Sequence, residues 1–325
     1  MTIVAWTEGS SLWERQVESL RTNHPHISVT VTTDAKAPEI PRAEIIIGHT
    51  FPEEVLRRAT NLRVLAVAMA GLDHLPNTLL AERGVQVINA HANGRYVAER
   101  VLALTLGALG KLVPYHQDLT RGRWHGFAAK EPVRDSWQSL VGMRTAILGT
   151  GAIGTWTARL YHAFECRTVG FKRQLAKPRK PFDEITPDLL EAVEGADVVV
   201  NTLPLTDHTV GLIDGPVFTA MQGALFVNVG RGSVADEEAL YHALTTGVLR
   251  GAAIDTWYNY PENGETVRYP ATLPFHTLDN VLLSPHVGGY TAAATKASLA
   301  EVFEAVDTYL TTDALTDPAD PAEQY

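Results

Sequence analysis

The stretch LGTGAIG, residues 148–154, places three glycines at the spacing of a loop that binds the pyrophosphate of a dinucleotide. It follows a β-rich run that begins at Arg144, and it leads into AIGTWTARLYHAFE, which favours a helix. This strand, turn and helix order is the context that the glycine spacing requires. We therefore interpret the stretch as a dinucleotide loop, and the alternative is a glycine-rich turn with a purely structural role.

Each glycine has a separate task in such a loop. Gly149 permits the tight turn, Gly151 lets the backbone approach the pyrophosphate, and Gly154 lets the helix lie close to the strand. The phosphates would then lie at the helix N-terminus. The expected loop residues are Gly149, Thr150, Gly151, Ala152, Ile153 and Gly154.

Two cations stand where NAD-binding loops of this kind place an acid. The next expected strand, RTVGF, is followed by Lys172 and Arg173. An acidic residue there would accept hydrogen bonds from the ribose 2′-hydroxyl of NAD, whereas two cations would pair with a 2′-phosphate. We therefore expect NADP (NADPH), with NAD less favoured. The alternative is a solvated basic loop, because the sequence stays basic through Lys180.

Apolar runs separated by segments suited to helices extend outward from this loop in both directions. The runs do not alternate with polar residues, which is typical of parallel strands buried on both faces. The sequence thus predicts an α/β fold with two Rossmann-like, doubly wound parallel sheets. The expected strands lie within residues 2–6, 43–48, 62–71 and 85–90, and again within 144–149, 166–171, 196–203, 224–230, 250–255 and 280–284.

Three other segments carry predictions of their own. A long helix is expected from Gly94 to about Val113, followed by an aperiodic excursion that could serve as an oligomerisation arm. In residues 235–247, Asp236 can cap a helix and Gly247 can end it. Residues 292–310 predict one long helix, and 311–325 a solvated acidic tail.

Bulk composition excludes several classes of protein. The 325 residues carry a net charge of -10, which offers no footprint for a nucleic acid or an anionic membrane. The single cysteine, Cys166, cannot form an internal disulfide, and no Cys/His cluster has zinc-ligand spacing, so no metal is expected. The sequence has neither a signal-peptide pattern nor a long apolar run, and we expect a cytoplasmic protein.

Four motifs give the sequence a specific resemblance. They are ADVVVNTLPLTDHTVGLID (196–214), FVNVGRGSVADEEAL (226–240), GAAID (251–255) and LLSPHVGGYT (282–291). In this order and spacing they resemble the D-isomer-specific 2-hydroxyacid dehydrogenase family, which includes glyoxylate and hydroxypyruvate reductases. The resemblance implies a substrate domain from residues 1–95 and 290–325, a dinucleotide-binding Rossmann domain over 96–289, and a homodimer.

The resemblance also implies a set of site residues. Arg231 would clamp the substrate carboxylate and polarise its carbonyl, and His286 would act as acid and base. The backbone amides of Ala70 and Gly71 would grip the carboxylate, although these residues could equally form a plain turn. Further cofactor contacts are assigned to Leu203, Pro204, Val229, Asp255 and Gly288, of which Asp255 could instead be a structural cap.

One position departs from the family pattern. The family usually has a glutamate five residues after the aspartate, where it pairs with the histidine, whereas this sequence has Tyr260. A neutral phenol can orient an imidazole but cannot stabilise its charged form as a carboxylate does. We therefore expect carbonyl reduction to be favoured at lower pH, unless Glu262 or Glu265 takes the role. Trp257, Tyr258 and Tyr260 could also line the substrate site or simply pack together.

These observations predict an NADP-dependent oxidoreductase that transfers hydride reversibly between nicotinamide and a small 2-oxo acid or D-2-hydroxy acid. Two alternatives remain open at this level. One is a nucleotide-sensing binding protein with weak or lost turnover, which the missing glutamate favours and the retained Arg231 and His286 oppose. The other is a dehydrogenase of the formate or phosphite type.

Overall fold

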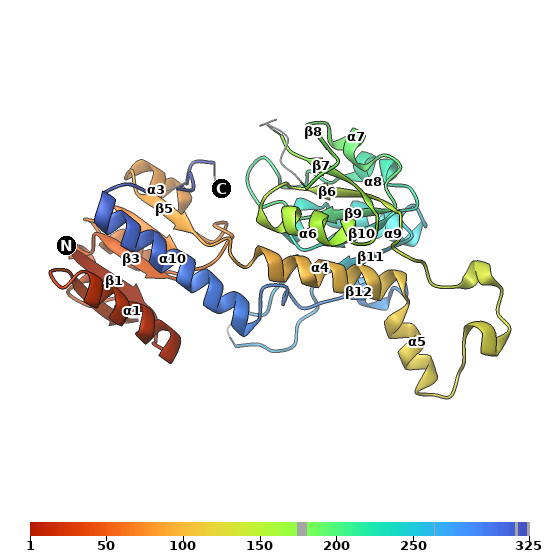
Figure 1. Ribbon diagram of the computed structural model, residues 1–325, viewed down its shortest axis with the longest axis horizontal. Coiled ribbons are helices and arrows are strands. Elements are labelled where there is room, and N and C mark those ends of the chain that lie inside the picture. Colours follow the sequence, from red (N-terminus) through yellow and green to blue (C-terminus); the bar gives the residue numbers. More distant parts are fainter. Residues whose placement is uncertain (174–180, 263, 316–317, 324–325) are drawn as a thin grey trace. The chain divides into compact units, whose positions relative to one another are not determined.

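The computed structural model describes residues 1–173, 181–262, 264–315 and 318–323, which form two compact units (Figure 1). Unit 1 comprises Met1–Asn93, Pro204–Asp207 and Thr291–Tyr325, and unit 2 comprises Gly94–Leu203 and His208–Tyr290. Each unit is built on its own parallel sheet with helices on both faces, which confirms the predicted fold class. The short segment Pro204–Asp207 groups with unit 1, although it lies inside the range expected for the dinucleotide domain.

Unit 1 contains a five-stranded sheet in the order β2-β1-β3-β4-β5. All neighbouring strands are parallel, and β3 and β4 are buried along their whole length, as their uninterrupted apolar sequences require. The strands are β1 (Thr2–Trp6), β2 (Ser28–Thr32), β3 (Ile45–Gly48), β4 (Val64–Val67) and β5 (Gln86–Asn89).

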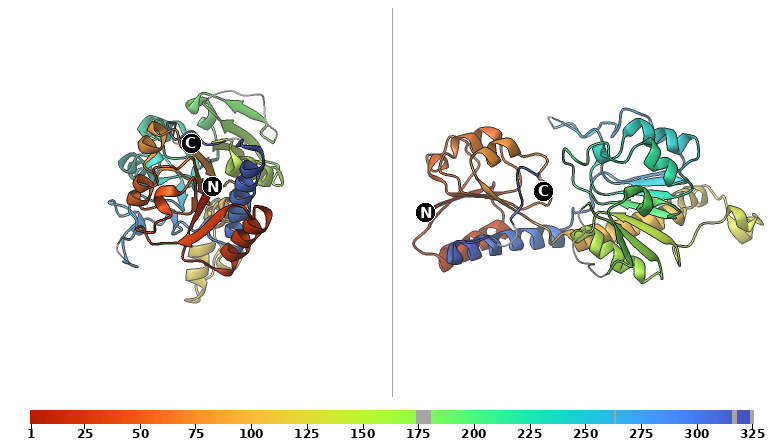
Figure 2. Two further views of the ribbon diagram at one scale, coloured as in Figure 1. Left: turned by 90° about the vertical axis from the view of Figure 1, so that its left-hand side faces the viewer. Right: turned by 90° about the horizontal axis from the view of Figure 1, so that it is seen from above.

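Helices cover both faces of this sheet, and Figure 2 shows α10 beside α1 on one of them. Side chains of α1 and α10, including Trp13, Val17 and Phe303, pack in one core, and those of α2 and α3, including Leu56 and Leu80, in the other. The helices are α1 (Ser11–Asn23), α2 (Glu53–Arg58), α3 (Asn77–Glu82) and α10 (Ala292–Thr312), with a short 3₁₀ turn, η1 (Ile40–Arg42).

The C-terminal segment departs from its prediction at one point, although most of its described residues are exposed as expected. Residues 311–325 were expected to form a solvated tail, but the backbone N–H of Ala319 donates to the carbonyl of Val87, at 2.9 Å, in an antiparallel bridge. Ala319 also packs against the core of unit 1. Because β5 is an edge strand, its unused backbone groups offer the tail a hydrogen-bond partner that the sequence pattern does not reveal.

Unit 2 contains a seven-stranded parallel sheet in the order β12-β11-β10-β9-β6-β7-β8. The strand order reverses between β6 and β9, which is where doubly wound sheets place their ligands. The strands are β6 (Arg144–Leu148), β7 (Arg167–Phe171), β8 (Glu184–Thr186), β9 (Val198–Asn201), β10 (Leu225–Asn228), β11 (Gly251–Ile254) and β12 (Val281–Leu283).

Helices α4 and α6 pack together against this sheet, whereas α7, α8 and α9 are linked to one another. At Gly94, an added Cβ would lie 2.8 Å from Cβ of Ala152, so the start of α4 needs a glycine to approach α6. The helices are α4 (Gly94–Leu109), α5 (Leu112–Leu119), α6 (Ala152–His162), α7 (Leu189–Val193), α8 (Gly215–Ala220) and α9 (Glu237–Thr245). The 3₁₀ turns are η2 (Gly126–Ala129), η3 (Val133–Asp135), η4 (Gly232–Val234) and η5 (Phe275–Thr277).

The capping chemistry expected for α9 is confirmed. The side chain of Asp236 accepts a hydrogen bond from the backbone N–H of Ala239, at 2.8 Å, and Gly247 has a φ of +76°. Leu240 and Leu244 are buried on one face of the helix. These local signals suffice because each acts within a few residues of the helix ends.

The long helix expected from Gly94 to Val113 is wrong in its C-terminal part. Helix α4 ends at Leu109, and a separate helix, α5, begins at Leu112 after Lys111 adopts a left-handed φ of 50°. The apolar pattern continues across this break, so periodicity alone joins the two helices. Strands β2 and β8 were not predicted: β2 is an edge strand in which only Val29 is buried, and β8 has only three residues.

Among the described residues, no helix combines the length and hydrophobicity that a bilayer span needs.

Candidate functional site

The residues predicted to bind cofactor and substrate in unit 2 lie at the carboxyl ends of its strands. Loops after β6, β7, β9, β10, β11 and β12 carry them, and all these strands are parallel. Parallel strands end at the same edge of a sheet, so the sequence-distant motifs share one edge.

The glycine loop joins β6 to α6 at the point where the strand order reverses. Gly149 has a φ of +103°, and an added Cβ would lie 2.6 Å from Oγ1 of Thr202. At Gly154 an added Cβ would lie 2.0 Å from the carbonyl oxygen of Gly149, so this contact requires glycine. Helix α6 starts after Gly151 without a side-chain cap. Its first N–H groups therefore suit the phosphates of a dinucleotide.

The two predicted cofactor-selecting cations directly follow β7. Lys172 is half-buried, and its backbone N–H donates to the carbonyl of Thr186 in β8, at 3.1 Å. Arg173 is exposed and also takes part in an interaction within the protein. The continuation of the basic run through Lys180 lies outside the described residues.

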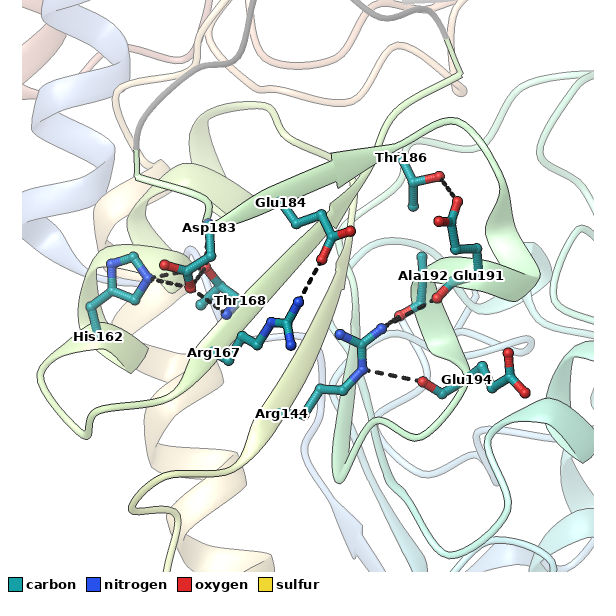
Figure 3. A network of polar contacts seen from close by, with 10 residues as sticks. All are labelled: Arg144, His162, Arg167, Thr168, Asp183, Glu184, Thr186, Glu191, Ala192 and Glu194. Atoms are coloured by element: carbon teal, nitrogen blue, oxygen red, sulfur yellow. Dashed lines mark hydrogen bonds and ion pairs between the residues drawn. The ribbon is translucent and has the colours of Figure 1, made fainter.

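Polar contacts hold β7 and β8 in place (Figure 3). The carboxylate of Asp183 accepts a hydrogen bond from the backbone N–H of Thr168, at 2.7 Å, and lies 3.0 Å from Nε2 of His162. Although burial raises it, these hydrogen bonds hold the pKa of Asp183 below its ordinary value. Arg167 and Glu184 form an ion pair at 3.0 Å. The strand that presents Lys172 is thus fixed at its far end.

Two buried asparagines that sequence analysis did not single out connect the loops after β9 and β10. Nδ2 of Asn201 donates to Oδ1 of Asn228, at 2.9 Å, and Oδ1 of Asn201 accepts from the backbone N–H of Leu203, at 3.1 Å. Both asparagines are almost fully buried. Their signal in the sequence is a polar residue at the end of an apolar strand, in VVVN and LFVN.

Arg231 lies between two glycines that have no room for a side chain. A Cβ on Gly230 would lie 2.5 Å from the carbonyl oxygen of Leu203, and one on Gly232 would lie 2.2 Å from that of Trp257. The Arg231 guanidinium donates from Nη1 to the carbonyl of Gly230, at 2.9 Å, and Nδ2 of Asn228 donates to the carbonyl of Arg231, at 3.2 Å. The backbone around this arginine is therefore packed against Leu203 and Trp257 and hydrogen-bonded to Asn228. Val229, one of the predicted cofactor contacts, is buried just before it.

Asp255 is the centre of a hydrogen-bond cluster rather than an exposed ligand group. The residue is 2% exposed, and its carboxylate accepts hydrogen bonds from the backbone N–H groups of Val287, at 3.1 Å, and Gly288, at 2.8 Å. The hydroxyl of Ser284 also donates to it. A Cβ on Gly288 would lie 2.9 Å from Oδ2 of Asp255. These contacts support a structural role for Asp255 as a cap of the loop that contains Val287 and Gly288.

His286 lies inside the loop that Asp255 holds. It has a left-handed φ of 55°, which is uncommon for a residue other than glycine. The Tyr260 ring lies beside it, with centroids 5.4 Å apart and planes at 55°. The Tyr260 hydroxyl accepts a hydrogen bond from the backbone N–H of Trp257, at 3.0 Å. The sequence-predicted partners His286 and Tyr260 are thus neighbours.

The rest of the aromatic cluster packs rather than lining an opening. Trp257 is buried, with its ring edge toward Phe275, and Tyr258 stacks on Phe275. Burial raises the pKa of the Tyr258 hydroxyl. Glu262 and Glu265 both form ion pairs with Arg268, at 3.0 and 3.9 Å.

The residues predicted to bind the substrate carboxylate through their backbone, Ala70 and Gly71, belong to unit 1. They lie in the loop that follows β4, directly after Met69. Nδ2 of Asn89 donates to the carbonyl of Ala70, at 2.7 Å, and the backbone N–H of Ala90 donates to that of Met69, at 3.0 Å. Pro204 also groups with unit 1, whereas Leu203 belongs to unit 2. Within the described ranges, no group of acidic, histidine or cysteine side chains could hold a metal ion.

A doubly wound parallel sheet with a glycine loop at its switch point defines the Rossmann class of dinucleotide-binding folds. Within that class, the chain belongs to the D-isomer specific 2-hydroxyacid dehydrogenase family, because the model of that family's NAD binding domain matches residues 102–288. The resemblance based on sequence motifs is thereby confirmed.

Curated relatives extend the similarity over most of the chain. A D-3-phosphoglycerate dehydrogenase from Methanocaldococcus jannaschii is 29% identical over 279 residues, which are 84% of this chain and 51% of the relative. The chain thus spans about half the length of that relative. A hydroxypyruvate reductase from Thermotoga maritima is 26% identical over 301 residues, which are 90% of this chain and 94% of the relative.

Solved structures share the fold. An NADPH-dependent glyoxylate/hydroxypyruvate reductase from Sinorhizobium meliloti is 24% identical, with a TM-score of 0.77 and 98% of each chain covered. A glyoxylate reductase from Paecilomyes thermophila is 20% identical, with a TM-score of 0.82 and 98% of each chain covered.

Proposed function

We propose that the protein is an NADP-dependent reductase of small 2-oxo acids, of the glyoxylate or hydroxypyruvate type, that also oxidises the corresponding D-2-hydroxy acid. The observation that carries this proposal is the loop of His286, whose left-handed backbone is fixed by the buried carboxylate of Asp255. Strained backbone held in this way is a common property of active sites. The family membership supplies the class of reaction.

Arg231 would recognise the substrate. Its planar guanidinium can bind a carboxylate through two hydrogen bonds and polarise the neighbouring carbonyl, which a lysine would do less well. The glycines on either side let its backbone lie against Leu203 and Trp257. The guanidinium therefore starts from a fixed backbone, which lowers the entropy lost when it binds substrate.

His286 would protonate the carbonyl oxygen during reduction and take the proton back during oxidation. Tyr260 replaces the family's glutamate beside it and is a neutral partner. Because Glu262 and Glu265 pair with Arg268, Tyr260 is the residue that would orient the imidazole. Reduction would then be favoured at lower pH, where more of the imidazole carries the proton to be transferred.

The nucleotide would lie along the strand ends of unit 2. The loop from Gly149 to Gly154 would hold its pyrophosphate, and Lys172 and Arg173 would bind the 2′-phosphate of NADP. Leu203, Val229, Asp255 and Gly288 lie on the loops that follow and would surround the nicotinamide end. When bound, the nicotinamide supplies or accepts the hydride.

Two further parts of the proposal concern unit 1 and the excursion after α4. The backbone N–H groups of Ala70 and Gly71, which belong to unit 1, would bind the substrate carboxylate. Residues 112–141, which comprise α5 and the chain that follows it, would join two copies in a homodimer, because this segment exposes a group of large apolar side chains. These side chains are Leu112, Val113, Leu119, Trp124, Phe127, Val133, Trp137 and Val141.

The deciding experiment is the initial rate of NADPH oxidation, with NADH in parallel, against 2-oxo acids from glyoxylate to phenylpyruvate. The expected result is turnover with NADPH well above that with NADH, and a preference for small acids. Tight NADPH binding without turnover would instead favour a nucleotide-sensing protein. A faster reaction of NADP⁺ with formate or phosphite than of NADPH with any 2-oxo acid would replace the proposed substrate class.

A further inference from the structure

The buried carboxylate of Asp255 has three hydrogen-bond donors but no direct cationic partner among the described residues. Transfer of a charged carboxylate out of water is costly unless it is paired or fully hydrogen-bonded. The three donors are the Ser284 hydroxyl and two backbone N–H groups. Its charge is therefore balanced by dipoles in its immediate surroundings.

Arg100, on α4, provides a positive charge that reaches Asp255 through one intervening group, the Ser284 hydroxyl. Its Nη2 donates to the hydroxyl oxygen of Ser284, at 2.8 Å. Its Nε is buried without a hydrogen-bond partner in the described part of the chain. A Cβ on Gly288 would lie 3.7 Å from Cγ of Arg100, so the arginine stem passes beside the same loop.

The direction of these hydrogen bonds follows from their chemistry. An arginine has no acceptor, so the Ser284 oxygen must accept from Arg100 and its single proton must point to Asp255. A cation, a hydroxyl and a carboxylate in a chain polarise one another and strengthen both bonds. Arg100 therefore fixes the orientation of Ser284 and, through it, one oxygen of Asp255.

The loop that carries His286 is anchored to this chain of groups on both sides. Ser284 lies before the histidine, and its carbonyl also accepts from Nε1 of Trp257, at 2.8 Å. Val287 and Gly288 lie after it and donate to Asp255. His286 itself has the unfavourable φ of 55°, so its backbone depends on both anchors.

We propose that Arg100 is a positioning residue that sets the geometry of His286 through Ser284 and Asp255. The effect on catalysis rests on the proposed function, in which His286 is the acid and base. The effect on the loop does not, because the hydrogen bonds of Val287 and Gly288 exist whether or not the protein turns over a 2-oxo acid. The two can therefore be tested separately.

The loop is tested first, by amide NMR spectra of the wild type, Arg100→Gln, Arg100→Lys and Ser284→Ala. Arg250→Gln is the matched control, because Arg250 donates to a backbone carbonyl of unit 2, that of Gly223, and has no role in the site. The amide signals of Val287 and Gly288 are expected to shift in Arg100→Gln and Ser284→Ala and to return toward wild type in Arg100→Lys. Unchanged Val287 and Gly288 signals in both Arg100→Gln and Ser284→Ala would overturn the proposal.

Kinetics of the same variants test the consequence for His286. Arg100→Gln is expected to lower kcat about 10- to 100-fold, in the range of groups that orient a ligand or catalytic side chain, with the Kd for NADPH within about twofold of wild type. The double variant Arg100→Gln/Ser284→Ala should be no slower than the slower single variant, because both break one chain of groups. Additive losses, or a loss of NADPH binding as large as the loss of kcat, would contradict a positioning role. A wild type without turnover would refute the proposed function and leave the NMR result to decide the role of Arg100.

Discussion

The strand ends of the two units are organised by different means. In unit 2, buried polar side chains hold the loops, namely Asn201, Asn228, Asp255 and Ser284. In unit 1, the loop after β4 is held through the carbonyls of Met69 and Ala70, and His49 follows β3 against Trp13. Unit 2 thus holds its strand-end loops through buried polar side chains, whereas in unit 1 the loop after β4 is held through its backbone carbonyls.

The largest expected effect concerns His286 in unit 2, the proposed acid and base. We predict that His286→Asn lowers kcat about 1,000-fold, within the range for loss of a general acid, and leaves NADPH binding intact. Asparagine tolerates the left-handed backbone at this position, so the protein should stay folded. The measurement is steady-state turnover with the best 2-oxo acid, with His276→Asn as the control. Turnover within tenfold of wild type would remove His286 from the catalytic role.

The glycine loop of unit 2 should be sensitive to a single methyl group. Gly154→Ala places a Cβ 2.0 Å from a backbone oxygen, so we predict a loss of about 3 kcal/mol in the free energy of unfolding. The measurement is urea unfolding. Gly215→Ala is the control, because its Cβ would meet nothing within 4 Å, and it should change stability by less than about 1 kcal/mol. Equal stabilities of the two variants would contradict the close approach of α6 to β6.

A smaller effect is expected from the cations after β7. We predict that Lys172→Ser/Arg173→Ser lowers the ratio of kcat/KM for NADPH over NADH about tenfold, because charge-assisted hydrogen bonds to the 2′-phosphate are lost. Arg167→Ser, at the start of the same strand, breaks an exposed ion pair with Glu184 and should leave the ratio unchanged. If the double variant keeps the wild-type ratio, the two cations have no part in cofactor choice.

The smallest effect concerns His49 in unit 1. Burial lowers the pKa of its imidazole below 6.5, so above that pH both the folded and the unfolded protein hold it neutral. As the pH falls below 6.5, the unfolded chain takes up the proton first, and stability is lost until the folded pKa is passed. We therefore predict that the difference in Tm, wild type minus His49→Gln, becomes smaller or more negative as the pH is lowered from 7.5 to 5.5. A constant difference would show that His49 is not held neutral by the fold.

Much of the fold could be predicted because its signals are local or periodic. Ten strand predictions, the caps of α9 and the long helix α10 rest on residues that are close in sequence. The break between α4 and α5 was missed because the apolar pattern continues through it. The bridge of Ala319 to Val87 was missed because it depends on an edge strand more than 200 residues away.

The amino-acid sequence by itself determined the α/β class, the glycine loop and the family. Apolar runs indicate buried parallel strands, glycine spacing indicates a tight loop, and the four motifs indicate the family. The sequence also predicted roles for Arg231, His286 and Tyr260, which remain predictions. Only the tertiary structure decided that Asp255 is buried beneath the His286 loop and that Ser284 links it to Arg100. The physical reason is that a hydrogen bond between buried side chains depends on which strands and helices meet. No local sequence pattern specifies that meeting, since these partners lie 29 and 184 residues apart along the chain.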